Sequence, residues 1–168
     1  MLRFVEGDIL LTDAQVIAHG IAPNDDFKQG LALALRERWP AMVKDFRHYC
    51  HTDKPEAGEA WMWGAVGGLR IVNLLTQDAA DAPGGRPGRA QPQHVHHALR
   101  ALREMAQREQ FESIALPRLA TGVGGMEWEE VLPEIRRTLG DLGIPIIVYT
   151  TYVRGTKANE GLPARAHA

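Results

Sequence analysis

The stretch Glu112-Ser-Ile-Ala-Leu-Pro117 has the composition of a buried strand, and Ala120-Thr-Gly-Val-Gly-Gly-Met126 follows it, before an amphipathic stretch that begins at Trp128. Three glycines among four residues let a backbone turn tightly and approach a ligand without Cβ atoms in the way. Successive amide N–H groups, together with the positive end of the following helix, can then hold phosphate oxygens. This order predicts an anion site, although a plain strand-to-helix connection is the alternative for one isolated loop.

A second stretch has the same order of elements. Ala18-His-Gly-Ile-Ala-Pro-Asn-Asp-Asp-Phe-Lys-Gln-Gly-Leu-Ala32 leaves a strand, passes through polar turn residues and enters a helix at Gly30. Two such loops could clamp one diphosphate. Neither a dinucleotide-binding G-x-G-x-x-G after the first strand nor a Walker A sequence is present, so those two nucleotide-binding classes are excluded.

Strand and helix patterns alternate along the chain. The apolar patterns predict strands over residues 2–5, 16–19, 60–63, 70–75, 114–116 and 144–149, and helices over residues 30–39, 42–49 and 93–107. Strands separated by helices indicate an α/β fold with a mostly parallel or mixed sheet and helices on both faces. In such sheets, ligands bind at the carboxyl ends of the strands.

The length of 168 residues, with 45% hydrophobic and 24% charged residues, is typical of one globular domain. We expect this domain to span residues 1–152. Residues 79–92 are dense in proline and glycine, and we interpret them as a mobile flap over the site. Residues 153–168 have little apolar content and are predicted to form a flexible C-terminal tail.

Charge and cysteine content narrow the function classes. A formal net charge of -2 argues against a general nucleic-acid binder. Cys50 is the only cysteine, so an internal disulfide and a thiolate zinc site are excluded, which fits a cytoplasmic location. Neither a signal peptide nor a membrane span is evident. We expect a monomer without cofactor or metal, and His94, His96 and His97 are interpreted as a solvated helix start.

Five motifs in order carry a resemblance to a known family. They are Gly7-Asp-Ile-Leu10, Ile17-Ala-His-Gly20, Gly30-Leu-Ala32, Ala115-Leu-Pro-Arg-Leu-Ala-Thr-Gly122 with Trp128 behind it, and Ile147-Val-Tyr-Thr150. Together they resemble a macrodomain, from about Leu2 to Tyr152. The sequence is similar to the branch that includes human terminal ADP-ribose protein glycohydrolase and the antitoxin macrodomains that remove ADP-ribose from DNA. The resemblance implies a three-layer α/β/α fold with a mixed central sheet.

The resemblance also implies how ADP-ribose would be held. Asp8 would accept a hydrogen bond from the exocyclic amine of adenine, the amide of Ile9 would read a ring nitrogen, and His19 and Gly20 would lie under the distal ribose. Residues 27–32 and 121–126 would be the two phosphate loops, and the last strand would flank adenine near Thr150 and Thr151. The implied binding residues are Asp8, Ile9, His19, Gly20, Phe27, Gln29, Gly30, Leu31, Ala32, Thr76, Pro117, Leu119, Ala120, Thr121, Gly122, Val123, Gly124, Gly125, Met126 and Thr151.

Two positions depart from the related glycohydrolases. The position of their catalytic lysine is Gln77, followed here by Asp78, and the loop aspartate of the human enzyme corresponds to Gly124. Glutamine forms no Schiff base, so these departures argue against a covalent lysine mechanism. Gln77 and Asp78 are the catalytic candidates at this position.

We expect that the protein binds ADP-ribose and hydrolyses ADP-ribosyl esters on Glu and Asp side chains, because a carboxylate leaves readily when a water is positioned at the anomeric carbon. Asp25, Asp26, Gln29 and Asp78 are polar side chains that could assist. Expected partners are ADP-ribosylated macromolecules, protein more than DNA. The alternatives are a reader that binds ADP-ribose without turnover and a phosphatase acting on ADP-ribose 1''-phosphate.

Overall fold

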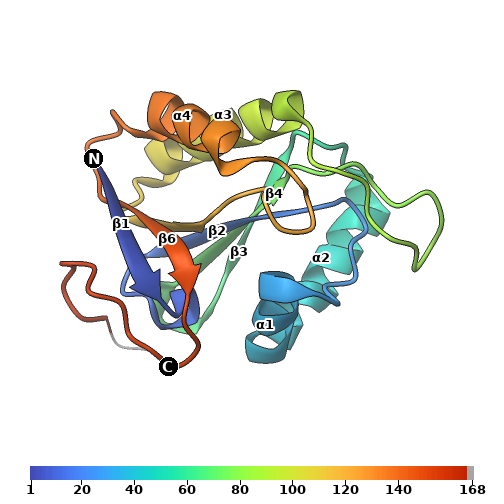
Figure 1. Cartoon of the computed structure of the whole chain (residues 1–168). Helices are drawn as coiled ribbons and strands as arrows, with labels where there is room; N and C mark the ends of the chain where they lie inside the picture. The colour runs from blue at the N-terminus through green and yellow to red at the C-terminus, as the bar shows by residue number, and fades with distance from the viewer. Residues whose placement is uncertain (166–168) are drawn as a thin grey trace.

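Six strands form one mixed sheet in the order β1-β6-β5-β2-β4-β3 (Figure 1). The structure is a computed structural model, and it describes residues 1–165. The strands are β1 (Leu2–Gly7), β2 (Val16–Ile21), β3 (Ala60–Gly64), β4 (Arg70–Leu75), β5 (Ile114–Pro117) and β6 (Ile146–Tyr152). The helices are α1 (Gly30–Arg38), α2 (Pro40–Asp53), α3 (Pro92–Glu109) and α4 (Trp128–Leu139), with short 3-10 turns η1 (Ile9–Leu11) and η2 (Val66–Gly68).

All neighbouring strands of the sheet are parallel except the edge pair β3 and β4. β2 pairs with β4 and β5, and β6 pairs with β1 and β5, all in parallel, whereas β3 pairs with β4 in antiparallel orientation. Val16, Ile17, Ala18 and Ile21 of β2 are all buried, because helices cover both faces of the sheet. The parallel arrangement brings the carboxyl ends of β2, β5 and β6 to one edge, where the connecting loops gather.

Two helical layers complete the fold (Figure 1). α3 and α4 cover one face, where Leu99, Leu102 and Ile135 pack in one buried cluster with strand residues. α1 and α2 cover the other face, where Leu35 and Phe46 belong to a second cluster. The predicted α/β fold with a mixed sheet and helices on both faces is therefore confirmed.

The boundaries of the predicted elements shift by a few residues. The last strand begins at Ile146 rather than at residue 144, directly after Pro145, which has no amide N–H for strand pairing. α2 begins at Pro40, a position that suits proline because the first helical amides have no intrahelical partner. Residues 79–91 contain no strand or helix apart from one bridge between Gln77 and Ala90. The predicted loop is therefore present, and the mobility of this flap stays a prediction.

The C-terminal residues differ from the expectation of a flexible tail. We call residues 153–165 the C-terminal segment; it lies beside β1 and β6 (Figure 1), and Ala158 and Glu160 within it are buried. The amide of Asp8 donates to the carbonyl of Thr156 at 2.7 Å, and the amide of Val153 donates to the carbonyl of Gly7 at 2.9 Å. Such backbone hydrogen bonds need no apolar content, which is why composition missed this packing. Residues 166–168 of the predicted tail lie outside the described residues.

Glu160 is the centre of the contacts made by the C-terminal segment. Its carboxylate accepts hydrogen bonds from the Thr12 hydroxyl at 2.5 Å, the Asp13 amide at 2.8 Å and the Tyr149 hydroxyl at 2.6 Å. Arg3 donates to the Glu160 carbonyl at 2.9 Å. These bonds join the start of the chain to β6.

None of the helices described in residues 1–165 combines the length and the apolar content that crossing a membrane requires.

Candidate functional site

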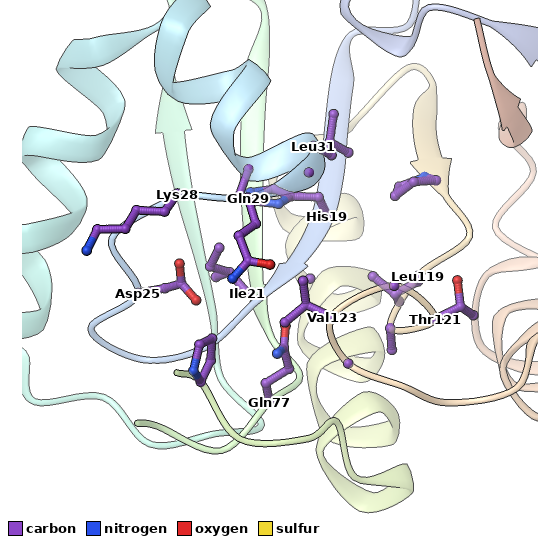
Figure 2. Close-up of a pocket in the computed structure, with 18 of the residues that line it drawn as sticks. His19, Ile21, Asp25, Lys28, Gln29, Leu31, Gln77, Leu119, Thr121 and Val123 are labelled. Atoms are coloured by element: carbon purple, nitrogen blue, oxygen red, sulfur yellow. The ribbon is translucent and has the colours of Figure 1, made fainter. Parts of the chain in front are cut away.

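A cleft of about 850 Å3 lies at the carboxyl ends of β2, β5 and β6 (Figure 2). Its walls are the β2–α1 loop (residues 22–29), the start of α1, the glycine-rich loop (residues 120–126) and part of the flap. The predicted site residues that line it are His19, Gly20, Gln29, Gly30, Leu31, Ala32, Gln77, Pro117, Leu119, Ala120, Thr121, Gly122, Val123 and Gly124. The fold therefore brings the two predicted anion loops to one cavity.

The β2–α1 loop presents the N-terminus of α1 to the cleft. Gln29 is the N-cap residue, and its side chain makes no capping hydrogen bond. Gly30 has a φ of 57°, and a Cβ at this position would meet nothing within 4 Å. Because the first amides of a helix lack intrahelical partners, this end is suited to a phosphate. Phe27 does not line the cleft: it is fully buried and packs edge-on against Phe46, with ring centroids 5.4 Å apart.

The glycine-rich loop is held in shape by its own backbone. The amide of Met126 donates to the carbonyl of Ala120 at 3.0 Å, and that of Gly125 donates to Gly122 at 3.1 Å. A Cβ on Gly124 would lie 2.6 Å from the Ala120 oxygen and 2.9 Å from the Ala90 Cβ. Glycine at 124 is thus required by the folded loop itself. Gly125 and Met126 belong to this loop but do not line the cleft.

The floor of the cleft is formed by β2 and the strand beside it. His19 donates from Nε2 to Asn73 Oδ1 at 2.7 Å, and both side chains are buried. A Cβ on Gly20 would lie 2.6 Å from the hydroxyl oxygen of Thr76. Thr76 is fully buried beneath Gly20 and does not line the cleft, so its contact with a ligand stays a prediction.

His19 is expected to make folding stability depend on pH. Burial lowers the pKa of His19 from 6.5 to about 4, and the hydrogen bond to Asn73 opposes this only in part. The folded protein therefore keeps His19 neutral, while the unfolded chain binds a proton below its ordinary pKa. Stability is lost as the pH falls from about 6.5 to about 4, by roughly 3 kcal/mol for this group.

Urea unfolding at about pH 7.5 and about pH 4.5 measures this effect, with His19→Gln as the control that titrates no proton at this position. We expect the wild type to lose roughly 2 kcal/mol more than the variant between these conditions. An equal loss in the two proteins would contradict the assignment.

The two catalytic candidates, Gln77 and Asp78, have different surroundings. Gln77 lines the cleft, and its side-chain amide donates to the Gly88 carbonyl of the flap at 3.0 Å. Asp78 does not line the cleft; its carboxylate contacts His94 at 2.9 Å and accepts from Gln91 at 3.3 Å. Adjacent side chains on an extended backbone point to opposite sides, so residue 78 faces α3.

The structure departs most from the predicted site at the adenine end. Asp8 is 6% exposed, and its carboxylate already accepts from the amides of Leu10 at 3.0 Å and Gly155 at 2.9 Å. Neither Asp8 nor Ile9 lines the cleft. Thr151 also lies outside it, whereas Tyr149, Thr150 and Tyr152 of β6 line it.

Several lining residues were not identified from the sequence. They are Ile21 of β2, Gly84, Gly85, Arg86 and Pro87 of the flap, Arg118, and Tyr149 of β6, whereas Lys28 lies within the predicted phosphate loop of residues 27–32. For Gly84, Gly85, Arg86 and Pro87 the available signal was the flap interpretation, which placed residues 79–92 over the site without choosing among them. Lys28 pairs with Asp26 at 3.0 Å, and the Arg118 guanidinium lies over the Trp128 ring at 5.8 Å.

The three clustered histidines have different partners, although the ring centroids of His96 and His97 lie 5.6 Å apart. His94 contacts Asp78, while His96 contacts Glu134 of α4 at 2.5 Å. Among residues 1–165, no group of three or more His, Cys, Asp or Glu side chains is placed to hold a metal ion.

The comparisons with known proteins agree with this architecture. A profile of the Macro domain family matches residues 24–135. The DNA ADP-ribosyl glycohydrolase of Thermus aquaticus is 27% identical over 169 residues, which cover 98% of this chain and 45% of that protein. The DNA ADP-ribosyl glycohydrolase of Mycobacterium tuberculosis is 23% identical, with 96% and 45% covered. The chain thus spans about half the length of these curated relatives.

Solved structures share the fold. The macrodomain of Thermus aquaticus DarG superposes with a TM-score of 0.79 at 25% identity, covering 89% of this chain and 98% of that one. Thermosipho africanus DarTG, described in complex with ADP-ribose, superposes with a TM-score of 0.77 at 21% identity, covering 96% of this chain and 43% of that one.

Proposed function

Because this chain belongs to the Macro domain family, we propose that it binds ADP-ribose in the cleft and hydrolyses the bond that joins ADP-ribose to a macromolecule. The observation that carries this proposal is the pairing of two anion-binding elements across one cavity, the open N-terminus of α1 and the glycine-rich loop. Both offer backbone amides to a diphosphate. The names of the curated relatives, which are glycohydrolases, favour hydrolysis over simple binding.

The ligand is proposed to lie across the strand ends. Adenine would lie near Thr150 and Tyr152 of β6, and the diphosphate would lie between the two loops. The distal ribose would then lie over Gly20, beside Gln77. This order follows the order β6-β5-β2-β4 of the sheet.

Asp8 remains our candidate for reading adenine, although its carboxylate already holds two amides. A carboxylate has about four lone-pair sites, so a further donor can be accepted. Burial raises the pKa of Tyr152, and the nearby negative charge of Asp8 adds to this effect, so Asp8 lies within reach of a side chain of the cleft.

We propose two classes of macromolecule to which the ADP-ribose is attached, and we call this macromolecule the carrier. The curated relatives are named for DNA, so DNA is the first candidate, and the expected preference for protein has no support from them. ADP-ribosyl esters on Glu or Asp are the second candidate, because a carboxylate leaves without a dedicated acid. Arg86 and Arg118 line the cleft and could hold phosphate groups of the ligand or of a nucleic-acid carrier.

Parallel incubation of the protein with thymidine-linked DNA, Glu-linked and Ser-linked ADP-ribose substrates tests the proposal. We expect release of ADP-ribose from the thymidine or Glu linkage, with the Ser linkage nearly inert because an alkoxide leaves poorly. ADP-ribose binding without release above the spontaneous rate would favour the reader. Release of phosphate from ADP-ribose 1''-phosphate alone would favour the phosphatase, and absence of ADP-ribose binding would reject the proposal.

Turnover is expected to leave no protein adduct that borohydride can trap, because Gln77 has no amine. Gln77→Ala should lower the turnover by less than about tenfold, since it removes one amide whose donor already bonds to the Gly88 carbonyl. Mass spectrometry after borohydride treatment and initial rates of the variant provide the measurements. A trapped adduct would show that an amine at another residue attacks the ribose, and a loss comparable to that of an essential nucleophile would show that residue 77 does chemistry.

A further inference from the structure

A second hollow of about 550 Å3 lies next to the cleft. It is lined by the β2–α1 loop, by Arg47 of α2 and, in the flap, by residues 80–85 and Pro87. The residues that line both cavities are Asp25, Asp26, Gly84, Gly85 and Pro87. The two cavities therefore meet between the β2–α1 loop and the flap.

This boundary lies at one end of the proposed ligand. The cleft runs from Tyr152 at β6 to Gln77 and the β2–α1 loop at its other end. If adenine lies near β6, the distal ribose lies at the end where the second hollow begins. An attached carrier then continues into that hollow, and the bond between ribose and carrier crosses the boundary. This placement rests on the proposed function.

Only two side chains at the boundary carry a carboxylate, and their surroundings differ. Asp26 is paired with the ammonium group of Lys28 at 3.0 Å. One oxygen of Asp25 accepts the amide of Phe27 at 2.8 Å, in the turn where Phe27 has a φ of 60°. In Figure 2 the Asp25 side chain points from its loop toward the interior of the cleft, on the side where Ile21 and Gln29 lie.

We propose that Asp25 is the general base that activates the water attacking the anomeric carbon of the distal ribose. The Asp25 carboxylate takes a proton from the water, the water oxygen forms a bond to the anomeric carbon, and the bond from that carbon to the carrier atom breaks. The electron pair of the broken bond stays on the carrier atom, which takes up a proton. The products are ADP-ribose, with a hydroxyl at the anomeric carbon, and the free carrier.

The protonation behaviour of Asp25 suits this role. Burial raises the pKa of Asp25 above its ordinary value; hydrogen bonds from the backbone of Phe27 and Ala22 oppose the shift, and the charge of Asp26 adds to it. A stronger base accepts a proton from water more readily. The other charged groups that line the two cavities around Asp25 are Asp26, Lys28, Arg47, Asp81, Arg86 and Arg118.

Asp25→Asn tests the base directly, because an asparagine side-chain oxygen can still accept the Phe27 amide and keep the turn. We expect kcat on the cleaved substrate to fall by about 100-fold or more, while the Kd for ADP-ribose stays within about threefold. Asp53→Asn, at an exposed position of α2 that lines neither cavity, is the matched control and should leave kcat within about twofold of the wild type. The rate of the wild type should rise with pH through the raised pKa of Asp25, and the residual rate of Asp25→Asn should not show this rise.

The outcomes distinguish a failure of this inference from a failure of the proposed function. Asp25→Asn with kcat within a few-fold of the wild type would overturn the assignment while leaving the hydrolase intact. A parallel loss of ADP-ribose affinity would overturn it as well, because the residue would then act in binding. A wild-type protein that releases no ADP-ribose from any linkage would reject the proposed function, and this inference with it.

Discussion

Gly124→Val is expected to lower the affinity for ADP-ribose by about 100-fold, which corresponds to the loss of two charge-assisted hydrogen bonds to the diphosphate. The reason lies in the loop rather than in the ligand. A Cβ at residue 124 would meet the Ala120 oxygen at 2.6 Å and the Ala90 Cβ at 2.9 Å, so the backbone must move. The Ala90 amide also donates to the Gly124 carbonyl at 2.9 Å, so the base of the flap moves with the loop.

Calorimetry with ADP-ribose measures the effect, and Gly122→Ala is the matched control in the same loop. A Cβ on Gly122 would meet nothing within 4 Å, so the loop should keep its shape and lose at most about tenfold in affinity. Full affinity in a folded Gly124→Val protein would mean that the glycine-rich loop is only a connector. Hydrolysis should be lost together with binding.

Glu160→Ala is expected to be the most destabilising single change proposed for this chain, at about 3 to 5 kcal/mol of unfolding free energy. The Glu160 side chain accepts from three donors, on Thr12, Asp13 and Tyr149, and Glu160 is 5% exposed. Removing the carboxylate leaves these buried donors without their acceptor. Such a loss corresponds to a fall in Tm of roughly 10 °C for a chain of this size.

Thermal and urea unfolding check this prediction. Glu104→Ala, at an exposed position of α3, is the control and should change the unfolding free energy by less than about 0.5 kcal/mol. The loss of unfolding free energy in Glu160→Gln should lie between those of Glu160→Ala and Glu104→Ala, because the glutamine keeps one acceptor oxygen and loses the charge. A Glu160→Ala protein as stable as the control would mean that the C-terminal segment contributes little to the fold.

The sequence by itself determined the alternation of elements and the position of the two anion loops. Apolar periodicity in stretches such as Arg70–Leu75 and the glycines of residues 122–125 act through local backbone preferences, which are readable without the fold. The parallel pairing of β2 and β5 then requires their carboxyl ends to share an edge. Loops that follow those strands therefore had to meet.

Only the tertiary structure decided which polar side chains remain available to a ligand. Asp8 is held by the amide of Gly155, and Glu160 holds Thr12, contacts that span most of the chain and leave no periodic signal. Gln77 and Asp78 are neighbours in sequence, yet one faces the cleft and the other faces α3. Long-range hydrogen bonds depend on how strands and loops are brought together, whereas sequence patterns record only local backbone preference and burial.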